Sequence, residues 1–166
     1  MEPDEKIMDT SRRTTWASIN HLQLGKFAEY FVTMAFVRAG FDVYTPALDD
    51  RGIDLVVRLD AGKYLEIQVK ATRNDSYVFM HKTSFPLDQY RYLAYVRFST
   101  DPEPSLYLIP AITWLTPSSL CVSRDYEGKK SRPEYGLSVT RSNQALLDAF
   151  HFDRVVAALA PMQAGS

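Results

Sequence analysis

The sequence predicts a single α/β domain in which helices flank a mixed central sheet, and three observations point to this fold class. Apolar residues recur at helical spacing near the start of the chain and again near its end. Between them lie several short runs rich in β-branched and aromatic residues, separated by turn signals. A chain of 166 residues, 46% apolar and 23% charged, can bury one core and has the composition of a globular protein.

The first helix is expected between His21 and Ala39. It follows residues 1–15, which show no periodicity and are expected to form a flexible tail, so the single folded domain is placed at residues 16–166. Gly40 comes directly after the helix, where glycine commonly ends helices. The residues expected to form the buried stripe recur at spacings of three and four: Leu24, Phe27, Ala28, Phe31, Met34 and Ala35.

The middle of the chain is expected to form the sheet, with turns at clusters of glycine, proline, aspartate and asparagine. The longest hairpin runs from Gly52 to Thr72 around a turn at residues 60–63. Residues 124–133 are charged, contain glycine and lack periodicity, so we expect an exposed loop there. The other expected strands are Phe41–Tyr44, Tyr77–Met80, Tyr90–Phe98 and Leu106–Ile109.

A second helix is expected near the C-terminus, because Ser142 can cap a segment of helical periodicity that ends at Pro161. The order helix, strands, helix is typical of a layered α/β domain, and no internal repeat or long linker divides the chain. The side chains of this helix expected to face inward are Leu146, Leu147, Phe150, Val155 and Leu159.

Composition disfavours several classes of protein. The N-terminus lacks the apolar segment of a signal peptide, and no run approaches the ~20 apolar residues of a membrane span, so we expect a cytoplasmic protein without membrane contact. A net charge of −1 provides no global attraction to nucleic acid, so any such surface must be local. Cys121, the single cysteine, lies between apolar neighbours and is interpreted as a core residue. The histidines share no ligand spacing, which disfavours a zinc site.

The long hairpin carries polar side chains where a packed strand would have few. Because side chains alternate along a strand, Glu66, Gln68 and Lys70 share one face, while the apolar residues between them face the other way. Asp54 opens the preceding strand, and Glu29 on the first helix is placed to reach toward it if the helix packs beside the hairpin. This face is therefore either solvated or holds a metal ion.

The order of these residues resembles the PD-(D/E)XK nuclease superfamily, in particular its Holliday-junction resolvase and Mrr-type branch, where a Gln-x-Lys variant occurs. The matched motifs are GKFAEYF around Glu29, RGIDLVV around Asp54, and EIQVKAT around Gln68 and Lys70. The resemblance covers roughly residues 25–73. It implies a restriction-endonuclease-like fold, with a mixed central sheet flanked by helices, and a Mg²⁺-dependent endodeoxyribonuclease.

The resemblance also implies a role for each matched residue. Asp54 would be the central metal ligand, completed by Gln68 and the carbonyl of Val69, with Mg²⁺ as the cofactor and Mn²⁺ as a substitute. Glu29 would hold a metal-bound water or a second ion. Lys70 would orient or help deprotonate the attacking water, or neutralise transition-state charge. The electrostatic role is favoured, because nearby acids stabilise the charged ammonium.

Two positions depart from the family pattern. Ile53 stands where the family usually has proline. Gln68 replaces the usual second acid, which removes one negative charge from a site for a hard dication. Glu66 lies on the same face and is an alternative ligand. The favoured interpretation is that Glu66 lies near the metal without binding it.

Nucleic acid, in particular DNA, is the expected partner, and a branched substrate and a homodimer are further expectations by analogy. The candidate phosphate contacts are Lys26, Arg51, Lys63, Arg73 and Lys82. Four aromatic residues are interpreted as core or interface packing and not as a base-stacking platform: Tyr90, Tyr92, Tyr95 and Phe98. Two alternatives remain open. One is a catalytically inactive nucleic-acid-binding or assembly module of the same fold, and the other is a plain interaction domain with a solvated hairpin face.

Overall fold

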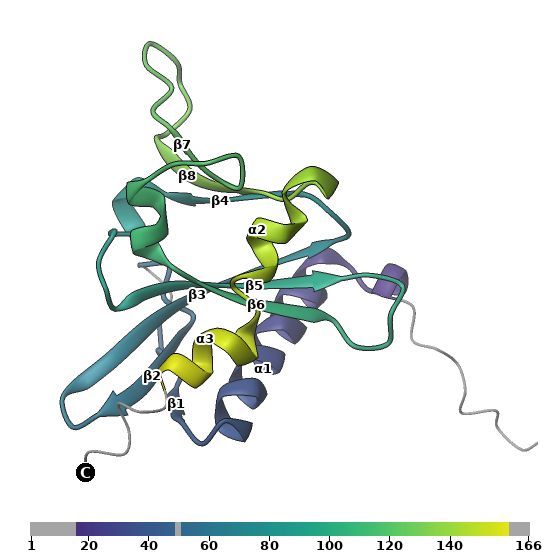
Figure 1. Cartoon of the computed structure of the whole chain (residues 1–166), viewed down its shortest axis with the longest axis vertical. Helices are drawn as coiled ribbons and strands as arrows, with labels where there is room; N and C mark the ends of the chain where they lie inside the picture. Colours follow the sequence, from purple (N-terminus) through teal and green to yellow (C-terminus); the bar gives the residue numbers. More distant parts are fainter. Residues whose placement is uncertain (1–15, 49–50, 160–166) are drawn as a thin grey trace, which may run out of the picture.

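Two β-sheets and the helices around them make up the part of the chain described by the computed structural model, residues 16–48 and 51–159. Helices α1 and α3 cover one face of the five-stranded sheet, and a three-stranded sheet lies on its other face (Figure 1). No helix in these residues is long and apolar enough to cross a membrane. The expected tail at residues 1–15 and the expected helix end at Pro161 lie outside the described residues.

Helix α1 (His21–Arg38) confirms the first expected helix. A capping box closes its N-terminus, because the Asn20 side chain accepts from the backbone N–H of Gln23 and the Gln23 side chain accepts from that of Asn20. The expected stripe is wrong for Phe27 and Met34, which are 37% and 54% exposed. Apolar residues surround much of this helix, so the sheet selects the packed face. That face is a row at spacing four: Leu24, Ala28, Val32 and Phe36.

The five-stranded sheet has the strand order β1-β2-β3-β5-β6. Strands β3 and β5 pair in parallel and the other neighbours pair antiparallel, which confirms the expected mixed sheet. The long hairpin of the sequence analysis is β2 and β3, with a tight turn between them. The strand bounds are β1 Asp42–Tyr44, β2 Leu55–Asp60, β3 Lys63–Arg73, β5 Arg91–Phe98 and β6 Ser105–Pro110.

The three-stranded sheet has the order β4-β8-β7 and is antiparallel throughout. Its first strand, β4 (Tyr77–His81), was expected, but β7 (Cys121–Arg124) and β8 (Glu134–Ser138) were not. These two strands are only 4 and 5 residues long and contain charge and glycine, so neither carries a clear alternating pattern by itself. The connection between them lies within the loop that the sequence predicts.

Two apolar cores lie on the two faces of the five-stranded sheet. The first packs α1 and α3 against residues such as Ile67, and the second packs the three-stranded sheet and Trp114 against residues such as Leu93. Cys121 is fully buried in the second core, as predicted. Three of the four aromatic residues interpreted as packing are buried, namely Tyr92, Tyr95 and Phe98. Tyr90 is 41% exposed and precedes β5, so that part of the prediction is wrong.

The C-terminal segment forms two helices where one was expected: α2 (Gln144–Asp148) and α3 (Phe152–Leu159). The break between them arises because β6 uses the backbone there, where the N–H of Leu108 donates to the carbonyl of Phe150 at 2.8 Å. Two finer expectations are also wrong. The N-cap of α2 is Asn143 in place of Ser142, and Thr140 caps the 3₁₀ turn Arg141–Asn143 before it, in a capping box with Asn143. Leu146 is 48% exposed where it was expected to face inward.

Candidate functional site

Asp54 is held against β3 by two hydrogen bonds. Its backbone N–H donates to the carbonyl of Ile67 at 2.9 Å, and its carboxylate Oδ2 accepts from the N–H of Val69 at 2.6 Å. Asp54 lies just before the start of β2, at the edge of the β2–β3 pairing. The carboxylate is therefore positioned by backbone groups of a central strand, which leave it little freedom to move.

Gln68 lies beside this carboxylate and is buried, with 8% of its surface exposed. Its Oε1 has no hydrogen-bond partner among the residues that the structure describes, which is costly for a buried polar atom. Gly52 packs on the amide, because a Cβ at that position would lie 2.9 Å from Nε2 of Gln68. Gly52 also has φ of +65°, where glycine is strongly preferred. Two independent constraints therefore require glycine beside Gln68.

Lys70 shares a face of β3 with Gln68, as alternation predicts. It pairs in register with Tyr95 of β5 and is partly buried. The opposite face of the same strand carries Leu65 and Ile67, which are 1% and 0% exposed in the core against α1. The structure thus brings Asp54, Gln68 and Lys70 to one side of the sheet.

Glu29 comes from α1, which covers the other face of the sheet. Its carboxylate forms a very short ion pair with the ammonium of Lys26, three residues earlier on the same helix. This bond is the main reason that the pKa of Lys26 is raised, and the charge of Asp54 raises it further. Among the described residues, the side chain of Glu29 thus pairs with Lys26 of its own helix. No hydrogen bond or ion pair in this part of the chain joins Glu29 to Asp54, Gln68 or Lys70.

Arg91 is a residue of this region that the sequence analysis did not identify. Its guanidinium is only 4% exposed, forms an ion pair with Glu66 at 2.8 Å and donates to the carbonyl of Gly52 at 3.2 Å. It therefore ties the loop before β2 to β3 and engages Glu66, the alternative ligand. An arginine at the start of the largely apolar strand β5 was the available sequence signal.

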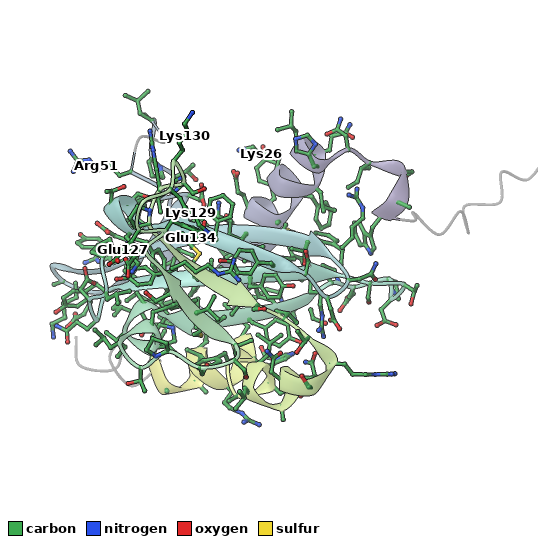
Figure 2. All side chains as sticks on the ribbon, turned by 90° about the horizontal axis from the view of Figure 1, so that it is seen from above. Lys26, Arg51, Glu127, Lys129, Lys130 and Glu134 are labelled. Carbon is green, nitrogen blue, oxygen red and sulfur yellow. The ribbon has the colours of Figure 1, made fainter. Side chains whose placement is uncertain are left out.

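The candidate phosphate contacts fall into different environments. Lys26 and Arg51 lie on the same side of the molecule (Figure 2), while Lys63 is exposed at the start of β3, beyond the hairpin turn. Arg73 donates to the carbonyl of Trp16 at 2.9 and 3.1 Å, and Lys82 donates to carboxylate and hydroxyl oxygens at 2.7 Å. Arg73 and Lys82, like Lys26, are thus engaged within the chain.

No three His, Cys, Asp or Glu side chains converge as a metal-binding group in residues 16–48 and 51–159. A metal ion at Asp54 would consequently depend on the Gln68 amide and on backbone oxygen as well as on carboxylates. The ligand set expected from the resemblance, in which Gln68 and the carbonyl of Val69 complete the ligands of Asp54, stays a prediction.

A cavity of about 690 Å³ opens elsewhere, near the carboxyl ends of β3 and β5. Its central cation, Arg97, bonds to the carboxylate of Asp75 at 3.0 Å and to the amide oxygen of Gln144 at 2.6 Å. Arg97 is therefore satisfied within the chain, and none of the residues around Asp54 lines this cavity. We place the candidate site at Asp54, Gln68 and Lys70, where a buried oxygen finds no partner within residues 16–48 and 51–159.

No protein-family model matches the sequence, and no curated protein is significantly similar to it. The bacterial homing endonuclease I-Ssp6803I is similar in structure, with a TM-score of 0.50 and 15% identity, covering 87% of this chain and 94% of that one. Hjc, a Holliday junction resolvase from the archaeal hyperthermophile Archaeoglobus fulgidus, has a TM-score of 0.47 and 12% identity, covering 77% and 98%. The similarity to the homing endonuclease establishes the fold. It is the restriction-endonuclease-like fold expected from the sequence.

Proposed function

We propose that this protein is a metal-dependent endonuclease that hydrolyses phosphodiester bonds in DNA. The observation that carries the proposal is the buried Oε1 of Gln68, which has no hydrogen-bond partner among the described residues. Gln68 directly precedes Val69, whose N–H binds the Asp54 carboxylate, and it shares a strand face with Lys70. A polar atom buried without a partner in a native protein calls for a ligand or an ordered water. A homing endonuclease has the same fold, so the architecture is compatible with this chemistry.

The donor atoms of Asp54, Gln68 and Val69 fit a Mg²⁺ site. Mg²⁺ prefers oxygen ligands and keeps several of its waters, so one or two carboxylates suffice. The N–H of Val69 points to Asp54, and the C=O of a strand residue points to the same side as its N–H. The Val69 carbonyl therefore faces the space beside the Asp54 carboxylate, and the amide oxygen of Gln68 supplies a third donor.

When bound, Mg²⁺ would lower the pKa of a coordinated water and polarise a phosphoryl oxygen. Lys70 would act through its positive charge, which stabilises negative charge developing on the phosphoryl oxygens. Glu29 would orient a water or hold a second ion from the side of α1. Lys26, next to Glu29, would neutralise a phosphate of the bound strand.

The test combines metal binding with cleavage. Mg²⁺ and Mn²⁺ are titrated by calorimetry, and supercoiled plasmid and a four-way junction are assayed for cleavage. Asp54→Asn should abolish metal binding, and Lys70→Ala should leave metal binding in place while cleavage falls about 100-fold or more. Asp60→Asn and Arg58→Ala, on the same sheet, are the matched controls and should behave as wild type. Cleavage that persists in both test variants would rule out these assignments.

A second candidate is a module of the same fold that binds nucleic acid without cutting it. The observation that favours it is Gln68 itself, because an amide contributes no negative charge to the site. Such a module would bind DNA in the absence of metal, would give no heat of metal binding and would leave plasmid intact. The calorimetric titration therefore separates the two functions even before cleavage is measured.

We also propose that the protein acts as a homodimer, since one site per chain can cut one strand at a time. Exposed apolar side chains on α1 support association, because such patches mark protein interfaces. These exposed apolar residues of α1 are Leu22, Tyr30, Met34 and Val37. Light scattering coupled to size exclusion would give the mass directly, and Met34→Lys/Val37→Lys should convert a dimer to a monomer. Preference for the four-way junction over linear duplex in the same assays would identify a branched substrate.

A further inference from the structure

The β7–β8 loop, residues 125–133, is the most protruding part of the described chain. Figure 1 shows it extending well beyond the three-stranded sheet, away from the rest of the molecule. A loop that projects in this way is mobile unless contacts with the rest of the protein fix its base. The structure shows that the base is fixed.

A buried carboxylate holds the two strands at the base of the β7–β8 loop. Glu134 is 7% exposed and accepts hydrogen bonds from the hydroxyls of Tyr77 at 2.5 Å and Tyr126 at 2.8 Å. Burial, followed by donation to Glu134, raises the pKa of Tyr77, so this phenol stays a donor at neutral pH. Arg124 lies over the ring of Tyr77 at 4.5 Å from its centroid. The loop thus starts from a bonded platform that links β4, β7 and β8.

A second anchor comes from the turn after β4. The ammonium of Lys82 donates to the carboxylate of Asp125 at 2.7 Å and to the hydroxyl of Ser123 at 2.7 Å, and it lies 4.7 Å from the ring centroid of Tyr135. This contact neutralises one of the two acids of the β7–β8 loop. It leaves Glu127 as the remaining acid against three cations, Lys129, Lys130 and Arg132.

The tip of the β7–β8 loop has a defined backbone. Tyr126 and Gly128 have φ of +52° and +71°, and the N–H of Lys129 donates to the carbonyl of Tyr126 at 2.9 Å. This tight turn presents Lys129 and Lys130 in succession, and both are exposed. Two adjacent lysines at a bonded turn form a small, positioned patch of positive charge.

In the view of Figure 2, which looks along the projecting loop, this patch and two cations closer to the candidate site lie toward the same edge of the molecule. These two cations are Lys26 and Arg51, and α2 and α3 lie toward the opposite edge (Figure 2). Lys26 is on the helix that covers one face of the five-stranded sheet, and the β7–β8 loop belongs to the sheet packed on the other face. Lys26 is paired with Glu29, so the exposed positive charge that the β7–β8 loop adds comes from Lys129 and Lys130, on a chain whose net charge is only −1.

We infer that the β7–β8 loop is an arm that contacts the phosphates of double-stranded DNA through Lys129 and Lys130, at a part of the duplex away from the site at Asp54. The inference rests on the proposed function for its substrate and adds a second contact region to it. Two lysines on a projecting turn reach phosphates without reading bases. The arm accordingly supplies affinity and orientation, and no sequence specificity.

The test measures binding without cleavage. Wild-type protein and Lys129→Ala/Lys130→Ala are titrated against a fluorescein-labelled DNA duplex in EDTA, at several salt concentrations. The variant should bind about tenfold or more weakly at low salt, and the slope of log K against log salt should fall by about 2, one for each lost phosphate contact. Arg141→Ala/Arg154→Ala removes two exposed charges next to α2 and on α3 and should change neither quantity. Lys129→Arg/Lys130→Arg should restore binding.

Each other outcome contradicts the inference that the β7–β8 loop binds DNA. An equal loss in both alanine pairs would mean unspecific electrostatics, and no loss would remove the β7–β8 loop from the interface. Tighter binding of an RNA duplex than of DNA would assign the surface to another partner. The proposed function fails in a different way, since DNA binding that depends on Lys129 and Lys130 without Mg²⁺- or Mn²⁺-dependent cleavage leaves the arm intact and removes the nuclease.

Discussion

Two hairpins of this molecule present polar side chains in opposite ways. In β2–β3 the turn is short, and the polar groups sit on or next to the strands, within the sheet, where backbone bonds such as Val69 N–H to Asp54 position them. In β7–β8 the strands are short, and the cations lie at the tip of a long loop, beyond the sheet. One hairpin places a few oxygens with accuracy, and the other projects charge over a distance.

The two arrangements suit different physical tasks. Metal coordination and phosphoryl transfer depend on positions within a fraction of an ångström, so their groups belong on rigid, paired strands. Phosphate contacts depend mainly on charge and tolerate displacement, so a loop with a bonded base is sufficient. The comparison predicts that substitutions in β2–β3 affect chemistry strongly and substitutions in β7–β8 affect binding and local stability.

The largest effect is expected for Gly52→Ala. A Cβ there would meet Nε2 of Gln68 at 2.9 Å, and the left-handed backbone adds strain, so we expect cleavage to fall about 100-fold and stability by about 1–2 kcal/mol. Gly62→Ala in the turn of the same hairpin has φ of +74° but no atom within 4 Å, and is the matched control. It should show a similar loss of stability with normal cleavage. Equal activities of the two variants would contradict a role for Gln68 placement.

Gln68→Glu tests whether this side chain touches the metal. The added negative charge should tighten Mn²⁺ binding about tenfold or more, while the metal-free protein loses about 1–3 kcal/mol because a carboxylate is buried there. Saturating Mn²⁺ should restore the thermal stability of the variant. Calorimetry and thermal melts with and without Mn²⁺ give both quantities, and an unchanged metal affinity would place Gln68 outside the ligand set.

Arg91→Met removes the link between the loop before β2 and β3. Glu66, its ion-pair partner, is 42% exposed and can regain water, so the expected cost is only about 1–2 kcal/mol. Cleavage should fall about tenfold, because the carbonyl of Gly52 loses its donor and the loop carrying it moves. Denaturant unfolding and initial rates measure the two effects. Full activity at reduced stability would make Arg91 a purely structural residue.

Tyr126→Phe tests the base of the other hairpin. It removes one hydrogen bond to the buried carboxylate of Glu134, so stability should fall by about 1 kcal/mol. Cleavage at saturating DNA should be unchanged, whereas affinity for duplex should fall two- to fivefold as the β7–β8 loop loses its position. Tyr64→Phe, whose side chain is 43% exposed on β3, is the control. A fall in the cleavage rate of Tyr126→Phe at saturating DNA would contradict the assignment of chemistry to β2–β3 and of binding to β7–β8.

The smallest effect at neutral pH concerns Cys121, at the start of β7. Burial raises the pKa of its thiol from 9.0 to about 12, so the folded state holds a proton that the unfolded state loses near pH 9. Stability should thus be independent of this group below pH 9 and decline as pH rises toward 12. In Cys121→Ala, the free energy of unfolding measured with denaturant should lack this decline between pH 8 and 11. A native thiol that reacts rapidly with a disulfide reagent at pH 8 would contradict the burial.

Regular elements with strong local patterns were predictable from the sequence. Helix α1, the β2–β3 hairpin and the apolar strands β5 and β6 all follow from periodicity and turn residues, within a few residues of their bounds. The strands β7 and β8 were missed because their short segments gain stability from pairing with each other and with β4, which no local pattern records. The split between α2 and α3 also arises from a contact between distant segments, because the N–H of Leu108 in β6 donates to the carbonyl of Phe150.

The candidate site likewise has a part that local sequence patterns predict and a part that depends on tertiary contacts. Alternation along one strand is a local property, so the sequence already placed Gln68 and Lys70 on one face, with Asp54 beside them. The rest depends on contacts between segments far apart in the chain. Only the tertiary structure decided that Gly52 packs on the Gln68 amide and that Arg91 engages Glu66. It also decided that the β7–β8 loop carries its lysines beyond the three-stranded sheet, because a segment's place in the fold is set by packing and not by its own sequence.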